Sequence, residues 1–573
     1  MKADGLITGL ADATSGMPKS NGSRYYPKAA VRIGVICDRF LYDSLEAAAD
    51  FVYLSPDISD VDLASLELLL VSSTWRGLRE NEWWKMYEEG SPTNRAALRI
   101  IARCRERGIP TVFLSKEDPP NYWVWLPLAR TCDYVFTSAQ ECVAYYRKDC
   151  GHDRVFTLRF CINPLLHNPV GMRFCAKRKT VLFAGSWARK YPRRCLELGQ
   201  VLDGIVKAGF TPDIINRNSF RNENRRYRFP RRFKRFLHPQ LDHDELMRFH
   251  RAYDWAVNVN SVQRSETMFA NRVYELQALG NLMISTPSLG MIRRFPNVFV
   301  ARSSDDVGRI LSAFSPQEIY AMQVAGVRRV MTGETCHDRL REIMERVGRP
   351  VPRVERRVLV VAEDVAACRA AFDAQTYSNR VLMSVNEVSE TDFGLADMVA
   401  FLDAGLAYGP HYLEDMANAF KYVDCDYVVS GGEREHDYTC RMGARGRVMF
   451  WRAAFDWCRL CGMKEGDRVS NGYVVDRFSC GKAGEFDALE ESIAKKMREL
   501  RPVVEKADEP SGEPEFLRED ALRRWRKLAV VGPFFGGVSC ILDNGWLYSA
   551  SHALGKARDL LAHLVSSRRK GNA

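Results

Sequence analysis

The sequence predicts an α/β protein built from several doubly wound domains. The chain has 573 residues, which is too long for one ordinary core and indicates three or four domains. Short apolar runs of strand length, some of them continuous as in buried parallel strands, alternate with helical patterns. This alternation is typical of parallel sheets that carry helices on both faces.

The amino-terminal part divides into a leader and a first domain. Residues 1–28 are rich in Gly, Ser, Asp and Lys without sustained periodicity, so we expect a flexible leader. Residues 29–168 are predicted to form the first domain, with polar residues directly after its second and third strands. Its predicted strands are residues 31–37, 66–72, 111–114 and 132–137, and residues 96–107 are a predicted helix.

The second domain is predicted over residues 178–350, and its first strand, 180–184, ends at Gly185 and Ser186. A glycine where a strand turns into a helix lets backbone amides approach a diphosphate at the positive end of that helix. Basic residues lie on this turn and after the next predicted strand: Arg189, Lys190, Arg193 and Arg217. The turn is therefore a candidate phosphate site.

A strand, a helix and a second strand are predicted within residues 253–296. The apolar run 255–259 is a strand, and the helix begins near Ala270 and ends at Gly280, a good residue for the position after a helix. Polar side chains lie where the strand ends, at the edge of a parallel sheet that forms its ligand crevice. They are Asn258, Asn260, Ser261, Ser265 and Thr267, with Arg272 and Glu275 on the helix behind them.

From Asn258 through Arg272 and Glu275 to Ser285 the chain resembles the donor-binding core of GT-B glycosyltransferases, in particular the CgeB-type branch. Residues 115–119 and 132–137 resemble the amino-terminal domain of the same proteins. The resemblance implies twin Rossmann-like domains, the first holding the acceptor and the second a nucleotide-diphosphate-sugar. Many GT-B enzymes place two glutamates eight residues apart, whereas here Glu266 lies nine before Glu275.

The resemblance also implies roles for individual residues. A glutamate at the position of Glu275 accepts hydrogen bonds from the ribose hydroxyls, for which an ionised carboxylate is well suited. The expected donor-binding residues are Gly185, Ser186, Arg193, Arg217, Asn260, Ser265, Thr267, Arg272 and Glu275, with Arg189 or Lys190 stabilising the leaving diphosphate. The alternative is that Glu275 is a solvated helix residue paired with Arg272.

The acceptor side carries two candidate proton acceptors, Glu117 and Asp118. A carboxylate that faces the cleft between the domains can take the proton of an acceptor hydroxyl. We prefer Asp118 because Pro119 restricts the chain beside it. The alternative for Asp118 is a turn-capping role without chemistry.

The third domain is predicted over residues 356–482 and resembles GT-A-type glycosyltransferases around residues 397–416. That family carries an Asp-x-Asp metal motif, in which Asp403 is present here and the second aspartate is Gly405. Because one carboxylate seldom holds Mg²⁺ or Mn²⁺ well, we expect a degenerate domain that recognises acceptor or mediates assembly. An active domain in a bifunctional transferase is the alternative.

No metal site and no cofactor other than the donor substrate are predicted. Cys458 and Cys461 form a single C-x-x-C pair without a second pair nearby, and His337 is expected to be a structural contact. Residues 483–573 are predicted to form a helical carboxyl-terminal region that carries no motif.

The net charge of +11 is concentrated in an Arg- and Lys-rich segment, residues 217–236. This segment favours phosphate-bearing partners, including the nucleotide-sugar, a lipid-linked acceptor and the surface of an anionic membrane. Tyr227 and Phe229 lie among the basic residues, but without a nucleic-acid-binding module a nucleic-acid partner is not expected. Scattered cysteines and the lack of a signal sequence or an apolar run of spanning length predict a cytoplasmic protein, with peripheral contact at the inner face of the membrane.

We therefore expect a bacterial, metal-independent glycosyltransferase that moves a sugar to a hydroxyl acceptor in cell-envelope glycan biosynthesis. The acceptor would be a cell-surface glycan or its lipid-linked precursor. The alternative is a non-catalytic glycan-binding or scaffold protein derived from glycosyltransferases.

Overall fold

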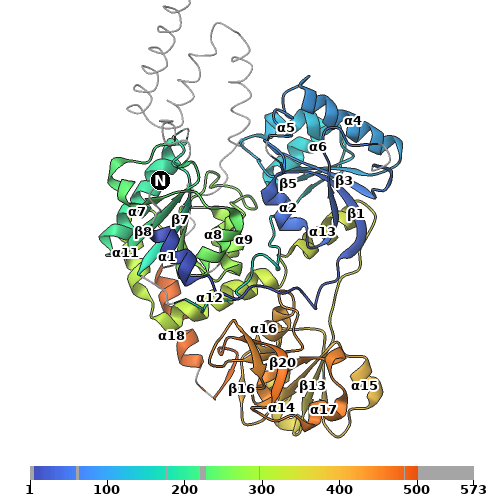
Figure 1. The fold of residues 1–573 in the computed structure, drawn as a ribbon, viewed down its shortest axis with the longest axis vertical. Helices are drawn as coiled ribbons and strands as arrows, with labels where there is room; N and C mark the ends of the chain where they lie inside the picture. The colour runs from blue at the N-terminus through green and yellow to red at the C-terminus, as the bar shows by residue number, and fades with distance from the viewer. Residues whose placement is uncertain are drawn as a thin grey trace, which may run out of the picture.

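Three α/β domains make up the described part of the chain (Figure 1). In the figure the first domain (blue) and the second (green) lie side by side, and the third (orange) lies below them. The computed structural model describes residues 5–59, 63–79, 81–175, 179–189, 191–219, 227–295, 297–482, 484 and 486–500.

The first domain is built on a six-stranded, fully parallel sheet with the order β2-β1-β3-β4-β5-β6. Its central strand β3, Leu68–Ser72, is buried along its whole length because helices cover both faces of the sheet. The other elements are β1 (Ala29–Ile36), α2 (Arg39–Leu45), β2 (Ala49–Tyr53), α4 (Pro92–Glu106), β4 (Thr111–Ser115), α5 (Tyr122–Ala129), β5 (Tyr134–Thr137), η1 (Gln140–Cys142), α6 (Val143–Cys150) and β6 (Val155–Thr157). The edge strand β2 was not predicted from the sequence.

The second domain has a parallel sheet with the order β12-β11-β10-β7-β8-β9. Numbered within the domain, this is the 3-2-1-4-5-6 order of Rossmann domains, in which the winding reverses between the first and fourth strands. Its elements are β7 (Thr180–Gly185), α7 (Pro192–Lys207), β8 (Thr211–Asn216), η3 (Arg231–Phe236), β9 (Leu237–His238), α8 (His243–His250), β10 (Trp255–Asn258), α9 (Arg272–Ala278), β11 (Leu282–Ser285), α10 (Leu289–Arg294), β12 (Val298–Val300), α11 (Ser304–Ala313) and α12 (Pro316–Met331).

The two parallel-sheet domains in series confirm the fold class predicted for the first two thirds of the chain. The predicted strand, helix and glycine stop of the central stretch are also present, since α9 ends just before Gly280, whose φ is +78°. Helix α13 (Cys336–Arg346) then crosses back and packs on the first domain through Leu340, Ile343 and Met344.

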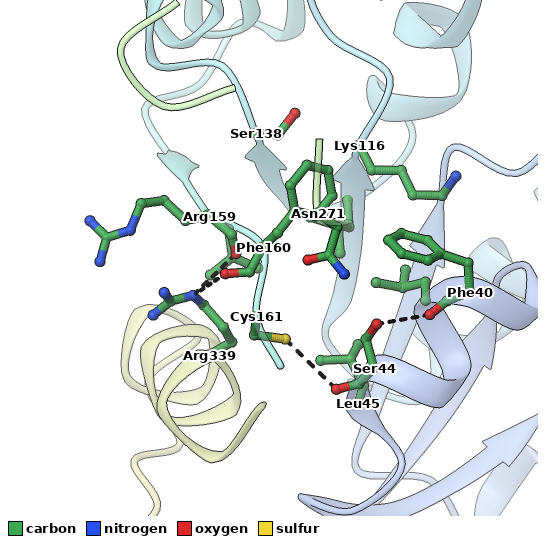
Figure 2. A pocket seen from close by; sticks show the side chains of 13 residues that line it. Phe40, Ser44, Leu45, Lys116, Ser138, Arg159, Phe160, Cys161, Asn271 and Arg339 are labelled. Atoms are coloured by element: carbon green, nitrogen blue, oxygen red, sulfur yellow. Dashed lines mark hydrogen bonds between the residues drawn. The ribbon is translucent and has the colours of Figure 1, made fainter. Parts of the chain in front are cut away.

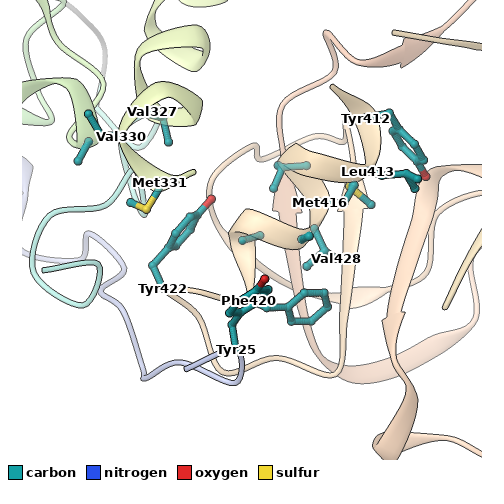
Figure 3. Close-up of a cluster of buried hydrophobic side chains, with 14 of the residues drawn as sticks. Tyr25, Val327, Val330, Met331, Tyr412, Leu413, Met416, Phe420, Tyr422 and Val428 are labelled. Atoms are coloured by element: carbon teal, nitrogen blue, oxygen red, sulfur yellow. The ribbon is translucent and has the colours of Figure 1, made fainter. Parts of the chain in front are cut away.

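The third domain contains a seven-stranded mixed sheet with the order β14-β13-β15-β19-β17-β20-β18. Its core is continuous with α12 of the second domain, because Val327, Val330 and Met331 face Tyr422 and Phe420 across the boundary (Figure 3). The elements are β13 (Val358–Ala362), α14 (Val365–Asp373), β14 (Arg380–Ser384), α15 (Glu390–Gly394), β15 (Met398–Leu402), β16 (Ala407–Tyr408), α16 (Tyr412–Ala419), β17 (Tyr427–Ser430), β18 (Tyr438–Arg441), η4 (Arg445–Arg447), β19 (Val448–Trp451), η5 (Arg452–Ala454), α17 (Trp457–Gly462), β20 (Arg468–Val475) and β21 (Cys480–Gly481).

The amino-terminal segment differs from the flexible leader expected from the sequence. Residues 5–13 form helix α1 (Gly5–Ala13), and Arg24 pairs with Asp424 at 2.5 Å and Asp426 at 2.6 Å in the third domain. Tyr25 is buried in the core that joins the second and third domains. The partners lie about 400 positions away in the sequence, so local periodicity did not reveal the packing.

Only part of the predicted helical carboxyl-terminal region lies within the described residues. Helix α18 (Asp487–Leu500) packs on the second domain, where Lys496 pairs with Glu318 at 2.7 Å. The remainder of the predicted helical region, residues 501–573, lies outside the described residues. Within the described ranges all cysteines are free thiols, and none of the helices has the length and apolar character needed to cross a bilayer.

Candidate functional site

A cavity of about 310 Å³ opens at the point where the winding of the second sheet reverses. Gly185 and Ser186 follow β7 on one side of it, and Asn260 and Ser261 follow β10 on the other. Ligands of doubly wound sheets bind at such a position because the helices leave the strand ends in opposite directions there. The cavity brings together five of the predicted donor-binding residues: Gly185, Ser186, Arg217, Asn260 and Arg272.

The floor of this cavity is held by short hydrogen bonds. The Asn218 Nδ2 donates to Ser186 Oγ at 2.6 Å, and a guanidinium nitrogen of Arg194 donates to the Ser186 carbonyl at 2.9 Å. A Cβ added to Gly185 would lie 2.6 Å from the Phe183 ring, so the turn requires glycine for space. These contacts fix the turn in place before any ligand arrives.

Asn260 supports the opposite wall. Its Nδ2 donates to Ser285 Oγ at 3.1 Å and to the Thr286 carbonyl at 2.8 Å, and its backbone N–H donates to Thr286 Oγ1 at 2.8 Å. The side-chain amide is therefore used to join the ends of β10 and β11. Asn260 shapes the cavity and is not free to turn toward a ligand.

The cavity is strongly cationic. Arg194, Arg217 and Arg272 line it, and no carboxylate is among its described lining residues. Burial lowers the pKa of Arg272 to about 10 even though Glu275 lies nearby, and burial lowers the pKa of Arg194 as well. Three like charges with no carboxylate among the lining residues of the cavity repel one another, so the cavity is suited to an anionic ligand.

Glu275 lies one helical turn beyond Arg272 and does not line this cavity. Its side chain is buried, with Oε1 accepting a hydrogen bond from Asn271 Nδ2 at 2.7 Å and lying 4.0 Å from His167 Nε2. The alternative of a solvated helix residue is therefore excluded. The carboxylate faces the boundary between the two domains.

His167, His243 and Glu275 form the one group of described residues whose spacing suits a metal ion, with their ligand atoms within 4.8 Å of one another. His167 Nδ1 accepts a hydrogen bond from the backbone N–H of Asn163 at 3.2 Å. Burial lowers the pKa of His167 to about 4, so the ring is neutral and its hydrogen is on Nε2. A protonated Nε2 has no lone pair to offer an ion, so the group does not fit a metal.

Ser265 and Thr267, which were expected to line the donor pocket, instead join the two domains. Thr267 Oγ1 accepts from the backbone N–H of Gln140 at 2.8 Å and donates to the Ser138 carbonyl at 2.8 Å. Ser265 Oγ donates to Glu141 Oε2 at 3.0 Å. The loop between β10 and α9 is thereby attached to the carboxyl edge of the first sheet.

Two of the remaining basic candidates, Arg189 and Arg193, are not among the residues that line the cavity. Arg193 is exposed and pairs with Glu197 at 2.9 Å, and Arg189 is exposed beside the turn. Lys190 lies outside the described residues. Glu266, whose role the resemblance left open, pairs with Arg293.

The two predicted proton acceptors occupy different environments. Asp118 is fully buried, and its two oxygens accept hydrogen bonds from Thr137 Oγ1 at 2.5 Å and the Tyr146 hydroxyl at 3.2 Å. Burial raises its pKa to about 7. Asp118 therefore has no exposed oxygen that could meet an acceptor, whereas Glu117 is partly exposed and accepts from Asn121.

At the carboxyl edge of the first sheet, whose winding reverses between β1 and β3, the space beside Lys116 is small (Figure 2). Lys116, at the end of β4, pairs with Asp38 at 2.7 Å and with Glu117 at 3.4 Å. The adjoining space, lined in part by Lys116, Phe40 and Phe160, has a volume of only about 20 Å³. It has room for a water molecule but not for a sugar.

Two residues that bear on the site were not selected from the sequence. Arg194 lines the cavity, and helical spacing could have identified it, because it shares the buried face of α7 with Leu198 and Val201. Glu141 is a partly buried carboxylate of the first domain that contacts Ser265 of the second. No local pattern indicates this residue, because its partner is 124 positions away.

Comparisons with known proteins agree with a glycosyltransferase-like second domain. A family model described as glycosyl transferase-like matches residues 216–345, and no curated protein gives a significant match. Similar solved structures include the pneumococcal O-GlcNAc transferase GtfA with UDP and GlcNAc (12% identity, 50% of this chain and 58% of that chain, TM-score 0.32), T4 phage BGT with UDP-glucose (11%, 56% and 99%, 0.35) and HepE of Anabaena with UDP (11%, 55% and 91%, 0.33). At these TM-scores the likeness carries no conclusion about substrate.

Proposed function

We propose that the protein is a GT-B glycosyltransferase that uses a nucleotide-diphosphate-sugar as its donor. The observation that carries this proposal is the cavity at the reversal point of the second sheet, lined by Arg194, Arg217 and Arg272 and by no described carboxylate. A diphosphate supplies the missing negative charge. The glycosyl transferase-like match covers the part of the chain that includes Arg217 and Arg272.

In this proposal the arginines hold the donor diphosphate and stabilise it as it leaves. The positive charge acts where negative charge develops, so no metal is needed for the departing group. Glu275, one helical turn beyond Arg272, would accept the ribose hydroxyls, with Asn271 Nδ2 orienting its carboxylate. Arg189, exposed beside the same turn, and Lys190, the next residue in the sequence, would assist the leaving group.

The acceptor hydroxyl needs a proton acceptor from the first domain. We assign this role to Glu141 in preference to Asp118, because Glu141 reaches the loop of the second domain through Ser265. Burial raises the pKa of Glu141, which makes its carboxylate a better base near neutral pH. Glu117 is the second candidate on the same edge.

The third domain is proposed to be a degenerate GT-A-like domain without catalytic activity. Asp403 Oδ1 accepts a hydrogen bond from the Gly405 backbone N–H at 2.8 Å, so the one remaining carboxylate of the motif is engaged in its own turn. The domain would serve acceptor recognition or assembly. A CgeB-type origin of the first two domains is part of the same proposal.

The acceptor is proposed to be a cell-envelope glycan or its lipid-linked precursor in a bacterium. The basic segment 217–236 would place a cytoplasmic enzyme near anionic headgroups, although part of it, 220–226, lies outside the described residues. In the described part Arg232 already pairs with Asp203 at 3.0 Å. Sedimentation with vesicles containing phosphatidylglycerol tests this contact.

Donor hydrolysis tests the central proposal. The full chain is incubated with UDP-, GDP- and CDP-sugars, and release of the nucleoside diphosphate is measured for wild type, Arg272→Gln and Glu141→Gln. Release with at least one donor that falls in both variants supports a transferase. Binding of a donor without release by wild type would favour the non-catalytic glycan-binding alternative.

A further inference from the structure

A second cleft, of about 690 Å³, lies at the edge of the first sheet where strands β1, β2 and β3 begin. It is bounded by the start of β1 at Ala29 and by helix α13, while Lys421 contributes from the third domain. Two crossing segments enclose it, residues 25–28 entering the first domain and residues 349–354 leaving it. Figure 1 shows both segments running between the first and the third domain. Its volume is in the range of small-molecule sites.

The charge of this cleft is predominantly positive. Two acidic side chains line it, Glu67 and Asp338, against five basic ones: Lys28, Arg341, Arg349, Arg353 and Lys421. Both acids are already engaged, since Glu67 Oε1 accepts from the Arg32 backbone N–H at 3.1 Å and Asp338 caps α13 through Thr335.

Lys421 is the most informative residue of the cleft. It is 6% exposed, and its Nζ donates to the Met331 carbonyl at 2.8 Å while lying 5.1 Å from the centre of the Tyr25 ring. Within the described residues, no ion pair with a carboxylate is formed by Lys421, by Lys28 or by Arg341. Burial lowers the pKa of Lys421 to about 8, since the charges of Asp338 and Glu414 offset the effect of burial only in part and Arg353 adds repulsion.

A buried ammonium without a carboxylate partner is unfavourable unless an anion compensates it. The aromatic wall is preformed, because the ring of Tyr26 stacks on His337 at 4.0 Å. The cations come from three separate parts of the chain, so an anion in the cleft would contact the entering segment, α13 and the third domain at once.

We infer that this cleft is a second ligand site, for a small molecule that carries a phosphate or diphosphate group. Lys28, Arg341 and Lys421 bind the oxyanion, and Tyr25 and Tyr26 form the wall against which the rest of the molecule packs. The site is separate from the donor cavity and does not depend on the transferase proposal. Its ligand would tie the first domain to the third.

Calorimetric titration with inorganic pyrophosphate tests the inference. Because pyrophosphate is also expected in the donor cavity, the parent protein for the test is the full-length Arg217→Gln/Arg272→Gln variant. Adding Lys28→Gln and Arg341→Gln should weaken the remaining pyrophosphate binding at least tenfold, as expected for the loss of two charge-assisted contacts. The matched control is Arg346→Gln, which removes the same charge from α13 outside the cleft and should change the affinity less than twofold.

Citrate distinguishes a phosphate site from a general site for polyanions, and pyrophosphate should bind more tightly than citrate. An equal effect of the cleft and control substitutions would overturn the inference. So would a parent protein that binds no pyrophosphate at millimolar concentration, or one that prefers citrate. Because Lys28 is exposed and Arg341 half-buried, matching thermal unfolding curves will show that the substituted proteins are folded.

Discussion

The first and second domains have the same kind of parallel sheet, but in the described residues the carboxyl edges of the two sheets differ in the room that they leave for a ligand. In the second domain that edge holds three arginines around a cavity of about 310 Å³. In the first domain the Lys116–Asp38 pair occupies the corresponding edge, and the adjoining space is about 20 Å³. Topology therefore provides the location of a site, while the side chains decide whether a ligand has room and charge to bind.

Two acids of the first domain, Asp118 and Glu141, differ in where their hydrogen-bond partners lie. Asp118 has both oxygens satisfied within its own domain, whereas Glu141 shares a hydrogen bond with the opposite domain. A group that is satisfied internally contributes to the stability of one domain. A side chain that is hydrogen-bonded to the opposite domain is sensitive to the relative position of the two domains.

The pH dependence of stability tests the internal role of Asp118 and should give the largest effect. Its pKa is about 7 when folded and near 4 when unfolded, so between these pH values the native state binds the extra proton. Stability should fall as pH rises from about 4 to 7, by up to about 4 kcal/mol, and then level off. Urea unfolding at pH 5 and pH 8 measures the change in the free energy of unfolding between these two pH values. Asp118→Asn should remove this part of the slope, and an unchanged slope would contradict the buried, protonated state.

Arg272→Gln tests the cationic crevice. Losing a charge-assisted hydrogen bond to the diphosphate should cost about 1.5–3 kcal/mol of binding free energy, or roughly 10- to 150-fold in affinity. Calorimetry with UDP, GDP and CDP measures the change. Unaltered affinity for a nucleotide that the wild-type protein binds would refute the location of the diphosphate.

Arg194 and Arg193 are neighbours on α7 and provide a matched pair. Arg194→Gln should weaken nucleoside diphosphate binding roughly tenfold, because its guanidinium lines the cavity. Arg193→Gln should leave affinity within about twofold, because Arg193 is exposed and pairs with Glu197. Equal losses in the two variants would support the sequence prediction for Arg193 against the structure.

Lys116→Met tests the closed edge of the first sheet. Although burial opposes its charge, Asp38 and Glu117 raise the pKa of Lys116, so the side chain is charged. Removing it should destabilise the protein by about 1–3 kcal/mol by leaving Asp38 without its partner. Urea unfolding checks this value, and the double variant with Asp38→Asn should recover part of the loss. The substitution should not create nucleotide binding at this edge.

The fold of the first two domains was largely accessible from sequence. Strands such as Leu68–Ser72 are continuous apolar runs, and Gly280 marks a helix end, so each element carries a local signal. The edge strand Ala49–Tyr53 was missed because it is only partly buried and has a weaker apolar pattern. The packing of residues 5–28 was missed because its partners are distant in the chain.

For the candidate site, the turn at Gly185 and Arg217 were selected because they follow predicted strands, and Arg272 because its helix resembles that of the family; the structure places all three at one cavity. The choice between Arg193 and Arg194, the burial of Asp118, the joining role of Thr267 and the position of Glu141 were not recognised. Each depends on which way a side chain points or on a contact between domains. Neither quantity has a local signature in the sequence.

The sequence by itself determined the order of strands and helices, the excess of positive charge and the turn that can receive a phosphate. The tertiary structure alone decided which strand ends meet, which of two similar crevices stays open and which cations share one cleft. The physical reason is the distance along the chain over which each effect acts. Backbone preferences and hydrophobic periodicity act over a few residues, whereas burial and charge compensation depend on groups that only folding brings together.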